Sequence, residues 1–180
     1  KISITEDFIF EIKQGASLQE VTNELDKMDL ITSNLFFKLN AKIHNIEKRI
    51  KAGEYLLSKS ESIFTLQRKF IEGDVFYRKL QFLEGMTTRD IFELGNSEGI
   101  IDDINGDLEA LKFKLNIIGQ TEGLFFPDTF YYKKGDAFSS LLKRAFDKQK
   151  IVYLDLWDSR QEGLPYTSFI EAITLASIIE

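Results

Sequence analysis

The sequence predicts an α+β chain in which a small strand–helix–helix–strand unit precedes a larger mixed α/β domain. Short segments of alternating apolar residues are separated by segments whose apolar residues recur every three or four positions, as strands and helices require. A glycine followed by a capping residue marks the change from strand to helix twice, at Gly15 and at Gly85. No run of about 18 apolar residues occurs, so no segment is expected to cross a membrane.

The composition is that of a globular protein and excludes several kinds of site. Of the 180 residues, 43% are hydrophobic and 29% are charged, and 16 Phe supply a large apolar area for a core. The net charge of −6 argues against nucleic acid as the main partner, because phosphate binding needs a basic surface. The absence of Cys excludes disulfides and zinc–thiolate sites, and the single histidine, His44, is expected at the surface. We therefore predict neither a metal nor a cofactor.

The first unit is predicted from two strands that flank two helices. Residues 8–14 alternate as a strand, and Ser17 and Glu20 form a capping box that opens the first helix. The second helix is expected over residues 33–45, and residues 50–57 return as a strand. The apolar stripe of the second helix that we expect to face the core consists of Phe36, Leu39 and Ile43.

The rest of the chain is predicted to combine helices with single strands. Thr87 is expected to cap a helix with Asp90 at its third position, and we interpret this second box as a common junction rather than a duplication. The aromatic-rich segment 122–132 is interrupted by Pro127, so we expect a loop or edge segment that packs its aromatic rings and exposes Glu122, Asp128 and Thr129. The remaining predicted elements are helices at 62–70 and 102–118, one long helix or two shorter ones at 137–158, a last helix that a Ser168–Glu171 capping box opens, and a strand at 75–83. A domain boundary is expected near residues 70–76.

The start of the chain carries a further pattern, Phe10-x-Ile12-x-x-Gly15-x-Ser17-Leu18-x-x-Val21, followed by Asn40 and Ile50-x-x-Gly53-x-x-Leu56. This pattern resembles a LysM module, although the needs of a strand–cap–helix junction account for much of it. LysM modules bind glycans that contain N-acetylglucosamine. The resemblance therefore implies that residues 1–72 form a LysM-like glycan-binding subdomain, which leaves residues 73–180 as the second domain.

Three strings in the second part stand in a fixed order: Glu84-Gly-Met-Thr87, Glu122-Gly-Leu-Phe-Phe-Pro-Asp-Thr129 and Ala176-Ser-Ile-Ile-Glu180. The string Gly163-Leu-Pro-Tyr166 lies between the second and the third. Together they resemble the motifs of the MltG (YceG-like) family of endolytic lytic transglycosylases. The resemblance covers nearly the whole chain, and residues 73–180 then correspond to the N-terminal part of the transglycosylase domain.

The resemblance implies a lyase that acts in cell-wall biogenesis. Family members are single-pass proteins of the bacterial inner membrane, with the enzyme domain on the extracytoplasmic (periplasmic) side. They cut peptidoglycan strands internally at the MurNAc–GlcNAc bond and leave 1,6-anhydro-MurNAc ends. The 6-hydroxyl of the sugar is the nucleophile, so one carboxyl group can act first as acid and then as base. The implied partners are peptidoglycan strands, with peptidoglycan synthases as candidates, and a membrane helix outside this chain.

The resemblance also implies where the catalytic acid lies. It is expected two positions after Glu180, so we expect a domain truncated at its C-terminal end, no catalytic residue within the chain, and no activity of the fragment alone. In a helix, that position would lie above Leu175 and Ile178, an apolar setting that raises the pKa of a carboxyl group. The candidates for substrate binding within the chain are Glu84, Glu122, Asp128, Thr129, Ser177 and Glu180.

Several of these candidates have structural alternatives. Glu84 can be a charge at a helix start, and Asp128 can pin the turn after Pro127. The aromatic residues of the same segment can stack on sugar rings or belong to the core; they are Phe125, Phe126 and Tyr131. The alternative function is a non-catalytic peptidoglycan-binding module. A cytosolic small-molecule lyase is less well supported, because the sequence has no phosphate loop, metal cluster or Schiff-base lysine in an apolar run.

Overall fold

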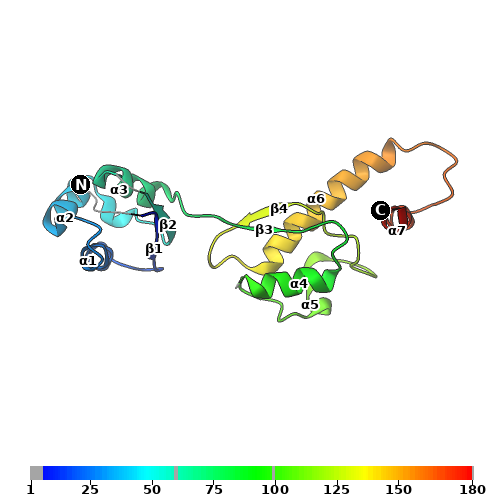
Figure 1. Ribbon diagram of the computed structural model, residues 1–180, viewed down its shortest axis with the longest axis horizontal. Coiled ribbons are helices and arrows are strands. Elements are labelled where there is room, and N and C mark those ends of the chain that lie inside the picture. Colours follow the sequence, from blue (N-terminus) through cyan, green and yellow to red (C-terminus); the bar gives the residue numbers. More distant parts are fainter. Residues whose placement is uncertain (1–5, 59–60, 99, 180) are drawn as a thin grey trace. The chain divides into compact units, whose positions relative to one another are not determined.

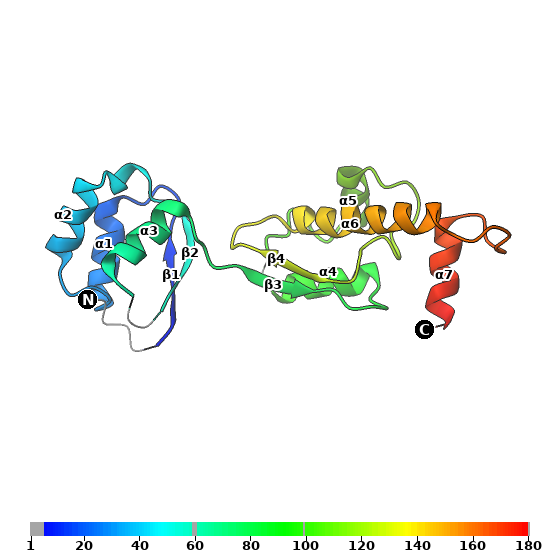
Figure 2. The same cartoon turned by 90° about the horizontal axis from the view of Figure 1, so that it is seen from above.

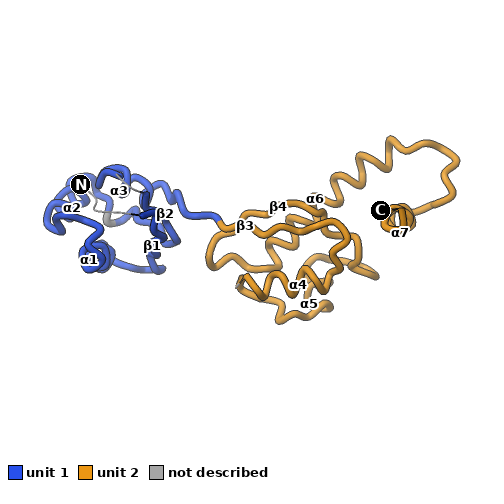
Figure 3. Tube along the Cα trace, in the orientation of Figure 1, with its two compact units in different colours: residues 1–77 blue, residues 78–180 orange. Residues whose placement is uncertain are grey.

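The computed structural model describes residues 6–58, 61–98 and 100–179. Helices and short antiparallel strands make up this part of the chain, which confirms the α+β class (Figures 1 and 2). The chain divides into two compact units, residues 1–77 and residues 78–180 (Figure 3). Within the described residues, each unit has one two-stranded sheet and its own cluster of buried apolar side chains.

Unit 1 combines three α-helices with a two-stranded antiparallel sheet. Phe10 of the first strand lies opposite Tyr55 of the second, and both rings contact Phe70, with centroids at 6.1 and 4.8 Å. The predicted capping box of Ser17 and Glu20 is confirmed. The elements are β1 (Phe8–Ile12), α1 (Leu18–Lys27), α2 (Asn34–Ile43), the 3₁₀ turn η1 (Ile46–Lys48), β2 (Gly53–Leu57) and α3 (Ile63–Glu72).

The prediction for the buried face of α2 is wrong. Phe37 and Ala41 are fully buried, whereas the predicted set is exposed: Phe36, Leu39 and Ile43. The backbone carbonyl of Phe37 accepts a hydrogen bond of 3.1 Å from the buried side chain of Gln67 in α3. The side chain of Ala41 is small enough for close packing, so α2 meets the core through a narrow face opposite to the longer apolar stripe.

Unit 2 combines a second antiparallel pair with four helices. Leu80 lies opposite Phe130 in this sheet. The predicted capping boxes of Thr87 with Asp90 and of Ser168 with Glu171 are both formed. The segment predicted at 137–158 is one continuous helix. The elements are β3 (Arg78–Gln81), α4 (Thr88–Ser97), α5 (Leu108–Leu115), β4 (Thr129–Tyr132), α6 (Phe138–Asp158) and α7 (Phe169–Ile179).

Two predicted elements are longer than the observed ones. The strand predicted from residue 75 begins only at Arg78, because Val75 packs in the core of unit 1 and the amide of Phe76 donates to Glu54. The helix predicted over 102–118 is confined to α5. Asn105 and Gly106 both have positive φ, at 52° and 64°, and this conformation interrupts a helix.

The likeness between the units extends beyond their capping boxes. Both follow the same order of strand, two α-helices, strand and α-helix. Gly15 and Gly85 have φ of 79° and 77°, which only glycine adopts without strain, and each makes the turn that precedes the capping residue. Buried apolar residues occupy equivalent positions in the two strand–helix segments: Phe10 and Leu80, Ile12 and Phe82, and Val21 and Ile91.

Candidate functional site: a groove in unit 2

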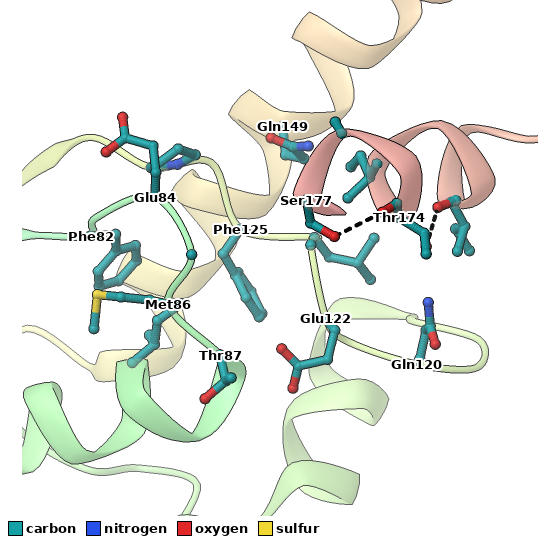
Figure 4. A pocket seen from close by; sticks show the side chains of 18 of the residues that line it. Phe82, Glu84, Met86, Thr87, Gln120, Glu122, Phe125, Gln149, Thr174 and Ser177 are labelled. Atoms are coloured by element: carbon teal, nitrogen blue, oxygen red, sulfur yellow. Dashed lines mark hydrogen bonds between the residues drawn. The ribbon is translucent and has the colours of Figure 1, made fainter. Parts of the chain in front are cut away.

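Unit 2 contains a groove of about 770 Å³ whose walls come from five parts of the chain (Figure 4). The β3–α4 loop, residues 82–87, forms one wall, and the loop 120–127 forms the floor beside it. Ile91 of α4, Gln149 of α6 and one face of α7 complete the lining. Residues of the first two predicted strings, 84–87 and 122–129, thus meet Ala176 and Ser177 of the third string in one groove.

The β3–α4 loop is held by backbone and capping interactions. The amide of Phe82 donates to the carbonyl of Asp128 at 2.9 Å, which ties the loop to the second strand of the sheet. Thr87 caps α4 and exchanges hydrogen bonds with Asp90. Glu84 lies between these anchors and is exposed, and its carboxylate points away from that of Glu122 (Figure 4).

Glu122 anchors the floor of the groove to α4. Its carboxylate accepts a hydrogen bond of 3.0 Å from the backbone amide of Thr88, the first residue of that helix. The hydroxyl groups of Thr88 and Thr121, both buried, lie 3.1 Å apart. The first amides of a helix have no partner within the helix and favour a negative charge. Glu122 therefore satisfies such an amide from a distant loop while its side chain faces the groove.

Helix α7 presents a mixed apolar and polar face to the groove. Ile170, Ile173, Thr174 and Ser177 line it at the three- and four-residue spacing of one helical face. The hydroxyl of Ser177 donates to the carbonyl of Thr174 at 2.9 Å and keeps lone pairs that can accept from a ligand (Figure 4).

The apolar residues expected around the catalytic acid lie on the other face of α7. Leu175 is 41% exposed and Ile178 is 75% exposed. Neither residue lines the groove. Within the described part of the chain, no side chain covers them enough to form the expected apolar setting.

Asp128 and Thr129 lie outside the groove, at the start of β4. Asp128 forms an ion pair with Lys148 of α6. That contact, followed by the hydrogen bond from the Thr129 amide at 2.7 Å, holds the pKa of Asp128 below its usual range. The ammonium group of Lys148 also lies 4.8 Å from the centre of the Phe126 ring. The pair of Asp128 and Lys148 thus stabilises the turn after Pro127, in agreement with the structural alternative for Asp128.

The six candidates are therefore separated by the fold. Three of them, Glu84, Glu122 and Ser177, line one groove, Asp128 and Thr129 do not, and Glu180 lies outside the described residues. Phe125 lines the groove from a nearly buried position, at 8% exposure, whereas Tyr131 is 57% exposed and lies elsewhere.

Sequence reasoning missed part of the lining. Ile170 and Ile173 are not among the predicted site residues, although their spacing with Ser177 marks one face of a helix. Gln149 has no such signal in the sequence, because only the packing of α6 brings it to the groove.

The groove combines hydrogen-bonding groups with apolar walls. Carboxylates, hydroxyls and an amide can bind the hydroxyl and acetamido groups of a carbohydrate, while the Phe and Ile side chains can contact its less polar faces. The described residues contain no group of three or more His, Cys, Asp or Glu side chains placed to hold a metal ion. None of the helices within these residues is both long and apolar enough to cross a membrane.

Comparisons with known proteins show which family the chain belongs to. A protein of Streptococcus pneumoniae named endolytic murein transglycosylase is 24% identical over 203 residues, which cover 94% of this chain. The chain spans only 36% of that relative's length. The crystal structure of a yceG-like protein from Listeria monocytogenes matches 86% of this chain and 58% of its own, with 20% identity and a TM-score of 0.38. The model of the YceG-like family matches residues 10–180, and the chain therefore belongs to the YceG-like family.

Proposed function

We propose that the protein containing this chain cuts peptidoglycan strands internally at the MurNAc–GlcNAc bond and leaves 1,6-anhydro-MurNAc ends. The observation that carries this proposal is the convergence of distant strings in one groove, residues 84–87, 122–127 and 176–177. A groove open at its surface can accept a strand away from its ends, as internal cleavage requires. The relative named endolytic murein transglycosylase supports the same class of reaction.

In this proposal the groove residues bind and position the glycan. Glu84 is exposed at the rim and accepts hydrogen bonds from sugar hydroxyls. Glu122 keeps the floor attached to α4 and offers its second carboxylate oxygen to the ligand. Ser177 accepts a hydrogen bond on the opposite wall, since its own proton is used within α7.

The catalytic acid is proposed to lie two positions after Glu180. It protonates the oxygen that leaves the anomeric carbon and then removes the proton of the 6-hydroxyl group that attacks this carbon. The bond to the leaving sugar breaks, the 1,6-anhydro bond forms, and the proton is returned, so no water is consumed. Most glycosidases need two carboxylates because water is their second reactant.

Glu180 is the matched comparison for that acid, because it is the carboxylate two positions earlier in the same string. The proposal assigns substrate contact to Glu180 and proton transfer to the later residue, and replacing each by Gln separates the two roles.

Unit 1 is proposed to bind glycan as a LysM-like subdomain. Its order of strand, two helices and strand is compatible with that assignment. A membrane helix that precedes this chain would hold both units on the extracytoplasmic side.

The test uses the full-length soluble ectodomain and isolated peptidoglycan. We expect 1,6-anhydro-muropeptides by mass spectrometry. The Gln variant of the residue two after Glu180 should lose at least a hundredfold in rate, as expected for removing a general acid. Glu180→Gln should mainly raise KM. If Glu180→Gln abolishes the rate while the later variant retains it, Glu180 is the acid and our assignment is wrong.

The same experiment tests the alternative of a binding module. If the protein sediments with peptidoglycan but no anhydro product forms, the groove is a binding site only. Water-derived reducing ends would contradict the intramolecular mechanism, because they require a hydrolase.

A further inference from the structure

The outer face of α2 is apolar although it points away from the core of unit 1. A surface helix normally turns its apolar stripe inward and its polar residues outward. In α2 the buried residues are Phe37 and Ala41, both at 0% exposure. The residues that form what we call the outer apolar face are Leu35 (69% exposed), Phe36 (49%), Leu39 (51%) and Ile43 (74%).

Helical geometry places these four side chains together. Leu35, Leu39 and Ile43 follow one another at spacings of four, and Phe36 lies beside them, one turn from Leu39. Their common direction is opposite to that of Phe37 and Ala41. Helix α2 also lies at the edge of unit 1 that is farthest from β1 and β2 in both views (Figures 1 and 2).

Basic side chains border this face. Lys38 and Lys42 flank it on one side, and with Leu35 and Leu39 they line a shallow crevice of about 350 Å³ next to α1. Neither lysine forms an ion pair within the part of the chain that the structure describes. Two arginines, Arg49 and Arg68, lie beyond the other side of the helix, where they line a hollow together with His44, exposed Phe64 and one acidic residue, Glu72.

The charge of this region differs from that of the whole chain. Residues 33–51 contain five Lys or Arg and one acidic residue, whereas the chain has a net charge of −6. Helix α2 itself has no acidic residue. The outer apolar face is therefore bordered by Lys38 and Lys42 and lies in a segment of net positive charge within an otherwise acidic protein.

We propose that α2 binds the surface of an anionic lipid bilayer. The helix lies parallel to the membrane, with its outer apolar face among the upper acyl chains and with Lys38 and Lys42 extended to the lipid phosphates. The face is the convex side of a helix from which side chains project, as insertion between lipids requires. The anionic phosphates of the lipids complement the positive charge of Lys38 and Lys42. A partner protein with an uncharged apolar groove would leave that charge unpaired. This inference is independent of the proposed cleavage reaction.

The test is flotation of the 180-residue chain with vesicles of phosphatidylcholine, with and without 30 mol% phosphatidylglycerol. We expect binding to the anionic vesicles, weakening on addition of 0.5 M NaCl, and little binding to phosphatidylcholine alone. Leu35→Gln/Leu39→Gln/Ile43→Gln should weaken binding at least about tenfold through loss of apolar insertion. Lys38→Gln/Lys42→Gln should weaken it by about tenfold or more, since each lysine contributes to attraction near the surface.

A matched control replaces exposed apolar residues outside this face. Phe113 and Ile118 are 86% and 98% exposed in unit 2, so Phe113→Gln/Ile118→Gln should leave binding unchanged. Circular dichroism checks that each variant is folded. If the triple variant does not fold, the lysine variant still tests the proposal, because it keeps every apolar residue. The proposal is overturned if the chain ignores anionic vesicles, if both α2 variants bind like the parent, or if the triple variant instead abolishes self-association in the absence of lipid.

Discussion

Asp103 joins three segments of unit 2 although it lies in a turn between helices. Its carboxylate forms an ion pair with Lys114 of α5 and accepts hydrogen bonds from the amide and hydroxyl of Ser139, at 3.0 and 2.6 Å. Ala137, at the cap position of α6, has no side chain that can accept from the helix, so Asp103 supplies the missing acceptor. Burial alone would raise the pKa of Asp103, but the hydrogen bonds from Lys114 and Ser139 lower it to about 2.

Asp103→Asn should reduce the free energy of unfolding at pH 7 by about 1–2 kcal/mol. A carboxyl group whose pKa is lowered by folding stabilises the protein above its unfolded pKa, near 4, and loses this effect as the pH falls through about 2. The difference in the free energy of unfolding between the parent and Asp103→Asn, measured by urea unfolding, should therefore be smaller at pH 3 than at pH 7. Asp147→Asn is the control, because its pair with Lys143 is half exposed and should contribute less than about 1 kcal/mol. A difference for Asp103→Asn that does not depend on pH would contradict the ion-pair role.

At the scale of the element, Gly123 determines how closely α7 approaches the floor of the groove. A Cβ at this position would lie 2.8 Å from Cγ2 of Ile173, and its φ is +73°. A Cβ at Gly163, whose φ is +79°, would have no heavy atom within 4 Å. The two glycines therefore share one backbone conformation and differ in whether a helix packs against them.

Gly163→Ala should cost about 1 kcal/mol from backbone strain alone. Gly123→Ala should cost the same strain and, in addition, push α7 away from the loop, for a total of about 2–3 kcal/mol. Amide hydrogen exchange should become faster in α7 for Gly123→Ala and stay unchanged there for Gly163→Ala. Equal exchange in the two variants would mean that α7 does not pack on this loop in solution.

At the scale of the whole molecule, the two buried clusters share no residue. The core of unit 1 contains residues from Phe10 to Val75, and the core of unit 2 begins at Leu80. The aromatic contacts of Phe10 and Tyr55 with Phe70 also stay within unit 1. Each unit therefore has the apolar burial that an independently folding domain needs.

Residues 1–77 should fold in isolation. We expect a cooperative thermal transition by circular dichroism and amide NMR shifts that overlay those of the same residues in the 180-residue chain. A fragment that ends at residue 72 would lose Val75 from the core and the hydrogen bond from Phe76 to Glu54, so it should be less stable by roughly 2 kcal/mol. Isolated residues 1–77 that show no cooperative transition would contradict the separation of the two cores.

The sequence by itself determined the α+β class, the order of the elements and the starts of the capped helices. The pairs Ser17 with Glu20 and Thr87 with Asp90 are local, because each joins atoms three residues apart and needs no partner from elsewhere in the chain. The motif strings also predicted that distant segments carry one site, and parts of all three strings line one groove, although the strings could not tell which of their members face it.

The tertiary structure decided which side of each segment is used. In α2 the longest apolar stripe faces outward because Phe37 and Ala41 pack more closely into the core, and periodicity cannot distinguish a buried stripe from an exposed one. Asp128 pairs with a lysine twenty positions away in α6, and that contact removes it from the groove. Glu122 faces the groove because its loop is held to the first amide of α4, a hydrogen bond that exists only once the chain has folded.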